Sequence, residues 1–130
     1  MNNLEKILVV EDDLLTMKIL NFILKKEGFA VSSAKDGLDA IERIAVIQPD
    51  MVITDVMLPL KSGLEVTSYV KDNFPNIPVI VLSALGEEER TVTKAFELGA
   101  DDFVAKPFNP NEFLLRVKRL LTKKNARIAV

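Results

Sequence analysis

Short apolar runs and amphipathic helical segments alternate along almost the whole chain, and this alternation constrains the fold more than any other feature of the sequence. Five runs have the length of strands, at residues 7–10, 30–33, 51–54, 79–82 and 102–105. Helical periodicity fills the gaps at 14–27, 37–46, 63–73, 87–98 and 110–123, with Gly or Pro near most of the helix ends. Because the runs are mainly apolar, they are typical of parallel strands covered on both faces. The sequence therefore predicts five consecutive βα units.

Such a repeat predicts an α/β fold, a doubly wound three-layer sandwich with a parallel five-stranded sheet between two layers of helices. A length of 130 residues is typical of one domain, and no segment has the composition of a linker. We therefore expect a single domain over residues 1–130, with its core at about 6–121 and a short C-terminal tail at 122–130. The N-terminus has no apolar segment of signal-peptide length, so we expect a cytoplasmic protein that does not associate with membranes.

The composition limits the chemistry that the chain can perform. Cysteine and histidine are both absent, which excludes disulfides, thiolate and imidazole metal sites, and Ser-His-Asp or Cys-His catalysis. The net charge of −2 is ordinary for a globular protein and gives no indication of a nucleic-acid surface. Carboxylates, lysine and hydroxyl groups remain as the groups able to carry chemistry.

Ligands of parallel sheets bind at the carboxyl ends of the strands, and four of the five predicted strands end in chemically active residues: Glu11-Asp12-Asp13, Asp55, Ser83 and Lys106. In a flavodoxin-like sheet, with strand order 2-1-3-4-5, the first and third strands are neighbours, so Asp12, Asp13 and Asp55 would share one pocket. Like charges at that range need a compensating cation, and a small set of oxygen ligands favours Mg²⁺ over Ca²⁺. Lys106 is the expected counter-ion in the protein.

Taken singly, each of these residues has a simpler structural interpretation. Asp12 and Asp13 suit the N-cap and first turn of the following helix. Asp55 and Ser83 are also common in turns, and a lysine at a strand end is usually a solvated charge. The functional interpretation depends on the fold bringing them together.

Four segments, ILVVEDD, DVMLPLKSG, VIVLSA and GADDFVAKPF, occur in an order and spacing that resembles the receiver domains of bacterial two-component response regulators, the CheY-like family. The resemblance covers about residues 6–121. It implies that Asp55 accepts a phosphoryl group, that Asp13 and Asp55 bind Mg²⁺ directly, and that Asp12 acts largely through a metal-bound water. It further implies that the Met57 backbone carbonyl completes the protein ligands, that Ser83 and Lys106 contact the phosphoryl group, and that Phe103 is an aromatic switch residue coupled to Ser83.

The function implied by this resemblance is two-component phosphorelay signalling rather than turnover of a separate substrate. The phosphoryl donor would be a phosphohistidine on a histidine kinase or phosphotransfer protein, and the domain would catalyse its own phosphorylation and slow autodephosphorylation. Met57 and Leu85 match positions flanking the path of attacking water, and both are apolar, which favours a long-lived phosphoryl group. Phosphorylation would reshape the face formed by the fourth helix, fifth strand and fifth helix, without direct nucleic-acid binding by this domain.

That same face carries charges resembling those with which some response regulators form symmetric homodimers, among them Asp102, Glu112 and Arg116. A solvated charged surface is an equally open interpretation. For the whole chain, a cofactor-binding flavodoxin-like enzyme is disfavoured because Glu11-Asp12-Asp13 would repel a phosphate at the first loop. A haloacid-dehalogenase-type phosphatase is disfavoured because Asp55 lacks a second Asp two residues later. A pseudo-receiver, which keeps the fold but only binds partners, is the remaining alternative.

Overall fold

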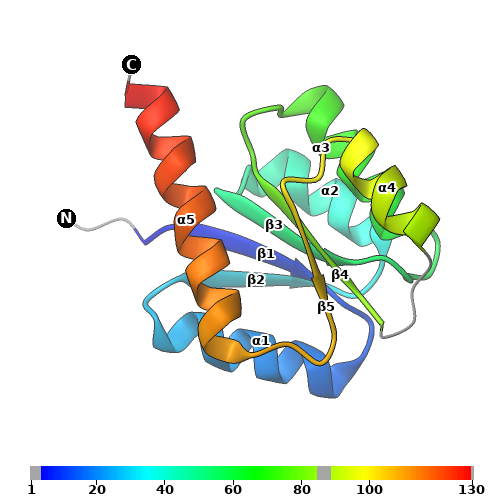
Figure 1. Cartoon of the computed structure of the whole chain (residues 1–130), viewed down its shortest axis with the longest axis horizontal. Coiled ribbons are helices and arrows are strands. Elements are labelled where there is room, and N and C mark those ends of the chain that lie inside the picture. Colours follow the sequence, from blue (N-terminus) through cyan, green and yellow to red (C-terminus); the bar gives the residue numbers. More distant parts are fainter. Residues whose placement is uncertain (1–3, 85–88, 130) are drawn as a thin grey trace.

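The computed structural model describes residues 4–84 and 89–129, which form one parallel sheet packed between two layers of helices (Figure 1). The strands are β1 Lys6–Val10, β2 Ala30–Ala34, β3 Met51–Asp55, β4 Val79–Ser83 and β5 Asp102–Ala105. The helices are α1 Leu14–Lys26, α2 Gly37–Ile47, α3 Gly63–Asn73, α4 Glu89–Glu97 and α5 Pro110–Ala129. All the predicted elements are present, although the expected start of the fourth helix at Glu87 lies outside the described residues.

The sheet has the order β2-β1-β3-β4-β5 and all its pairings are parallel, which confirms the predicted flavodoxin-like α/β fold. Its register places Val10 beside Thr54, Asp55 beside Leu82 and Ser83 beside Ala105. The carboxyl ends of β1, β3, β4 and β5 therefore meet along one edge of the sheet, with β3 at the centre.

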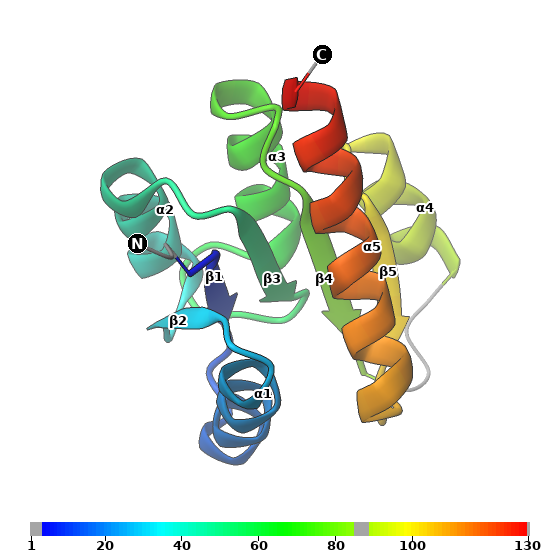
Figure 2. The same ribbon diagram turned by 90° about the vertical axis from the view of Figure 1, so that its left-hand side faces the viewer.

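Side chains alternate between the two faces of the sheet, and each face has its own apolar core. In β1, Ile7 and Val9 pack with residues of α1 and α5, including Phe113, whereas Leu8 and Val10 pack with residues of α2, α3 and α4. Figure 2 shows α1 and α5 on one side of the sheet and the other three helices on the opposite side. Both faces are covered, which explains why the central strands β3 and β4 are buried at every position and are mainly apolar.

The last helix is longer than the sequence pattern predicted, since α5 continues to Ala129 instead of ending at Lys123. Residues 124–129 contain neither Gly nor Pro, so nothing in them stops a helix. Lys124 Nζ also donates a hydrogen bond to Asp50 Oδ1 at 3.0 Å, and Asp50 Oδ2 accepts the Lys6 N–H at 2.7 Å. This contact holds α5 beside the start of β1 at Lys124, five residues before the helix ends at Ala129.

Among the described residues, no helix is both long enough and apolar enough to cross a membrane, and this includes α5, the longest of them.

Candidate functional site

Four chemically active residues lie at the edge where the parallel strands end. Glu11 follows β1, Asp55 ends β3, Ser83 ends β4 and Lys106 follows β5. Since Val10 pairs with Thr54, the next step of the register brings Glu11 beside Asp55. Both carboxylates are buried, with Glu11 2% and Asp55 8% exposed. A buried carboxylate is costly unless it is paired, so this edge requires a cation.

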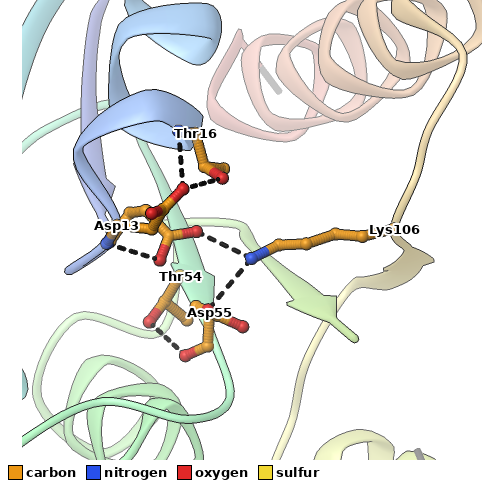
Figure 3. A network of polar contacts seen from close by, with 6 residues as sticks. Asp13, Thr16, Thr54, Asp55 and Lys106 are labelled. Carbon is orange, nitrogen blue, oxygen red and sulfur yellow. Dashed lines mark hydrogen bonds and ion pairs between the residues drawn. The ribbon is translucent and has the colours of Figure 1, made fainter. Parts of the chain in front are cut away.

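Lys106 supplies a cation to both buried carboxylates. Its Nζ lies 2.8 Å from Glu11 Oε1 and 3.0 Å from Asp55 Oδ2, and Figure 3 shows the side chain extending from the end of β5 toward Asp55. Burial by itself would lower the pKa of Lys106, but the hydrogen bonds and charges of Glu11 and Asp55 outweigh it, so the pKa is raised above its ordinary value. Lys106 therefore stays protonated, and the predicted pairing of Lys106 with Asp55 is present.

Three carboxylates form a group with the spacing of a cation site. Oxygens of Glu11, Asp12 and Asp55 all lie within 4.8 Å of one another, with Asp12 on the exposed side of the group. Three negative charges against the one ammonium of Lys106 leave a net negative charge, and a set of oxygen donors suits a hard divalent cation. The residues present therefore fit Mg²⁺.

Asp13 has a different position from the one expected for a direct metal ligand. It is the N-cap of α1, and its Oδ2 accepts hydrogen bonds from the Thr16 hydroxyl at 2.6 Å and the Thr16 N–H at 2.9 Å (Figure 3). These two bonds, the hydroxyl first, lower the pKa of Asp13 below its ordinary value. Its carboxylate is not a member of the acidic group, and Glu11 takes that place. The sequence places Glu11 among the residues at the strand ends, but no role as a ligand was predicted for it, although it directly follows the first apolar run just as Asp55 follows the third.

Asp13 nevertheless contacts the group through its backbone, because its N–H donates to Glu11 Oε2 at 3.2 Å. The side chain of Glu11 is thus held from two directions, by this N–H and by Lys106. This arrangement ties the start of α1 to the geometry of the acidic group.

The expected switch residues lie on the strands beyond Asp55. Ser83 is buried at the end of β4, next to β3, and its carbonyl accepts the Lys106 N–H at 2.8 Å. Phe103 in β5 is half-buried against the core on the α2–α4 side, with its ring centroid 6.4 Å from that of Phe96. Met57, in the loop after β3, exposes its side chain to solvent. Leu85 lies outside the described residues.

Charged residues of β5 and α5 pair within the chain. Arg116 Nη1 lies 2.9 Å from Asp102 Oδ2 and its Nη2 lies 3.0 Å from Glu112 Oε1. The hydrogen bonds that Arg116 donates to Asp102 and then to Glu112 raise its pKa above the ordinary value. Beside these charges, Phe96 and Leu115 are exposed. Asp102, Glu112 and Arg116, three of the charges expected at a dimer face, therefore already pair with one another in one molecule.

The comparisons with known proteins agree with this geometry. Residues 7–118 match the family model of the response regulator receiver domain. The chain is 33% identical to the signal receiver domain of a signal transduction histidine kinase from Syntrophus aciditrophicus, with a TM-score of 0.85 over 92% of this chain and 91% of that one. A response regulator receiver domain protein from Clostridium thermocellum is 25% identical, with a TM-score of 0.88 over 95% and 98% of the two chains.

A CheY-like receiver domain protein from Methanospirillum hungatei JF-1, 24% identical, has the same fold, with a TM-score of 0.92 over 96% of this chain and 99% of that one. The matched region spans the acidic residues after β1, Asp55 and Lys106. On its sequence, its fold and the acidic group at the ends of β1 and β3, this chain belongs to the response regulator receiver domain family of two-component signalling.

Proposed function

We propose that Asp55 accepts a phosphoryl group from a phosphohistidine of a histidine kinase or phosphotransfer protein. The observation that carries this proposal is the position of the Asp55 carboxylate, at the end of the central strand, 3.0 Å from the Lys106 ammonium and within the acidic group. In the reaction a P–O bond forms to Asp55 as the P–N bond of the donor breaks, and the imidazole leaves with the electron pair of that bond. An ionised carboxylate needs no general base for this step, so positioning and charge neutralisation suffice.

Receiver domains bind Mg²⁺ at an acidic pocket, and the proposed ligands here are carboxylate oxygens of Glu11, Asp12 and Asp55 with the backbone carbonyl of Met57. When bound, Mg²⁺ neutralises the negative charge of the incoming phosphoryl group. This set replaces Asp13, expected from the resemblance, with Glu11, because Asp13 caps α1. Asp13 then acts on the site indirectly, through the N–H that it donates to Glu11.

Lys106 and Ser83 are proposed to convert phosphorylation into a change of surface. Lys106 already contacts Asp55, so a phosphoryl group on that carboxylate adds oxygens within reach of the same ammonium. Ser83 would donate its hydroxyl to another phosphoryl oxygen. A shift of Ser83 would free space for Phe103, whose half-buried ring faces the α4 side. The face of α4, β5 and α5 would then change its binding properties, including any symmetric dimer formed through it.

The surface beside Asp55 has the apolar character expected of a docking site for the phosphoryl donor. Leu15, Ile19 and Phe22 of α1 are 67%, 44% and 67% exposed. Ile19 also lines a groove of about 390 Å³ whose other walls include Lys106, Pro107 and Phe108. A donor helix that covered these side chains would bring its phosphohistidine toward the end of β3. Receiver domains interact with histidine kinases, and we propose this surface for that contact.

Titration with Mg²⁺ followed by beryllofluoride, a stable analogue of the phosphoryl group, tests the proposal. We expect saturable Mg²⁺ binding and a beryllofluoride-dependent change in the amide spectrum around Asp55 and Phe103. Asp55→Asn should abolish the response, because an amide is a poor nucleophile and a weaker metal ligand, whereas Asp72→Asn, an exposed carboxylate on α3, should retain it. A folded wild-type chain that binds neither Mg²⁺ nor beryllofluoride would support the pseudo-receiver alternative.

A further inference from the structure

The loop between β3 and α3, residues 56–62, directly follows the phosphoacceptor and carries Met57, whose carbonyl is a proposed metal ligand. Its near end is held by the sheet and by α3. The Val56 N–H donates to the Leu82 carbonyl at 3.0 Å, and the Val56 carbonyl accepts the Gly63 N–H at 2.9 Å. These bonds fix the first residue and the end of the loop but leave its middle to be positioned by other contacts.

The middle of the loop rests on the first residue of α2. The Gly37 N–H donates to the Pro59 carbonyl at 3.2 Å, and the same carbonyl accepts the Lys61 N–H at 2.8 Å. The Lys61 carbonyl oxygen lies only 1.8 Å from the point where a Cβ of residue 37 would stand, and its carbonyl carbon lies 2.5 Å from it. Only a residue without a side chain allows the two backbones to approach so closely.

Helix α2 is a firm support for this contact. Asp36 caps it by accepting the Asp39 N–H at 2.7 Å, and its own residues Gly37, Ala40 and Ile44 are buried. On the loop side, Leu60 has a φ of 69°, in the left-handed region that leucine rarely adopts. A residue in that region persists when its surroundings hold it, and the neighbouring Pro59 and Lys61 are the residues that Gly37 contacts.

We infer that Gly37 is a positioning residue for the metal site. Because residue 37 has no side chain, the 56–62 loop can approach the start of α2 closely, and this approach determines where the Met57 carbonyl lies. The inference rests on the proposed function, because it concerns the affinity of that site for Mg²⁺. The nearest atoms to a Cβ at residue 37 belong to Lys61, and the Gly37 N–H donates to the Pro59 carbonyl. Gly37 acts through Pro59 and Lys61.

Gly37→Ala is the direct test. A Cβ cannot remain 1.8 Å from a carbonyl oxygen, so the Lys61 backbone must move by more than about 1 Å. We expect the Mg²⁺ dissociation constant, measured by calorimetry, to rise about tenfold, since a misplacement of that size weakens a positioned contact while the carboxylates remain. The Mg²⁺ concentration giving half-maximal phosphorylation by acetyl phosphate should rise equally, with the rate at saturating Mg²⁺ recovering to within about threefold. Amide signals of residues 56–61 should shift even in metal-free protein.

Two further variants separate positioning from simple loss of stability. Gly28→Ala introduces a Cβ that meets nothing within 4 Å at a positive φ of 93°, so it should lower the melting temperature and leave Mg²⁺ affinity unchanged. Asp36→Ala removes the cap of α2 without adding an atom to the contact, and should weaken Mg²⁺ binding about threefold by fraying the supporting turn. Wild-type Mg²⁺ affinity in folded Gly37→Ala, or in Asp36→Ala should the first variant not fold, overturns the inference. Absence of Mg²⁺ binding by the unaltered chain would instead refute the proposed function.

Discussion

Replacing Lys106 with Met tests the central ion pair of the site, because it removes the ammonium and keeps most of the aliphatic side chain. Without Lys106, the Glu11 side chain, which is 1% exposed, and the Asp55 side chain, which is 11% exposed, lose a cation at 2.8 and 3.0 Å. Breaking a buried pair costs about 3–5 kcal/mol. Because Lys106 is partly exposed and Glu11 retains the Asp13 N–H, we expect a smaller loss of about 2–3 kcal/mol in the free energy of unfolding without metal.

The same substitution should strengthen Mg²⁺ binding. A unit positive charge about 4 Å from a divalent cation repels it by about 2 kcal/mol even in water. Screening by salt lowers this repulsion, so removing the charge should raise Mg²⁺ affinity about tenfold. Thermal unfolding should therefore show a melting temperature roughly 8–12 °C below wild type without metal, and a larger increase on adding Mg²⁺ than wild type shows. Lys118→Met is the matched control, because Lys118 pairs with Glu27 at 2.8 Å on the exposed surface and should contribute about 0.5 kcal/mol or less.

The pH dependence of this difference has a defined direction. The pKa of Lys106 is raised in the folded protein, so its contribution to stability is complete below the ordinary value of 10.5 and is lost as the pH rises through the higher folded-state value. The stability difference between wild type and Lys106→Met should thus stay constant through neutral pH. An unchanged melting temperature, or Mg²⁺ stabilisation no greater than in wild type, would refute the assigned role of Lys106.

Three other predictions concern the acidic residues and the loop after β3. Asp12→Ala should weaken Mg²⁺ binding in calorimetry more than Asp13→Ala does, which reverses the ranking expected from the resemblance. Asp13→Ala should instead lower the melting temperature, because it removes the cap of α1. A greater loss of Mg²⁺ affinity in Asp13→Ala than in Asp12→Ala would show that Asp13 is a direct ligand. In Asp50, burial raises the pKa, but hydrogen bonds from the Lys6 N–H and Lys124 lower it overall. Asp50→Asn should therefore lower the free energy of unfolding, measured with urea at neutral pH, by about 1 kcal/mol. This difference between wild type and variant should persist down to pH 3.8 and disappear as the pH falls through the lower pKa of Asp50 in the folded protein. Met57→Asn should speed decay of the phosphorylated protein in excess Mg²⁺, because an amide can orient an attacking water; a tenfold change needs only about 1.4 kcal/mol of barrier, and equal or slower decay would contradict this account.

The fold could be predicted from the sequence because both faces of the sheet are buried. That burial makes the central strands β3 and β4 apolar over most of their length. Gly and Pro mark most helix ends, and the segments 102–105 and 63–73 were predicted with the bounds observed. The end of α5 could not be predicted. Just beyond the predicted end at Lys123, Lys124 is held by Asp50, a partner distant in the sequence, and no local pattern records that contact.

The site was predictable to the level of the strand ends, and the choice among adjacent carboxylates was not. Glu11, Asp12 and Asp13 are three consecutive acids, and their composition does not say which points into the pocket. The register of β1 against β3 brings Glu11 beside Asp55, and Asp12 belongs to the same group, whereas the Thr16 hydroxyl bonds the Asp13 carboxylate at the start of α1. The Asp-x-x-Thr spacing is a local signal for a helix cap, and it favours the structural interpretation of Asp13.

The internal pairing of Arg116 bears on how selective the α4, β5 and α5 face can be. A second molecule that formed an ion pair with Arg116 would first have to separate it from Asp102 and Glu112. Ion pairs between the molecules would then replace those within one molecule, and the total number of pairs would not increase. Exposed pairs contribute about 0–1 kcal/mol each, which makes such an exchange nearly isoenergetic for a surface with matching carboxylates and unfavourable for any other. For a partner that bound at this face, the charges would thus determine specificity, and the affinity would have to come from exposed apolar side chains such as Phe96 and Leu115.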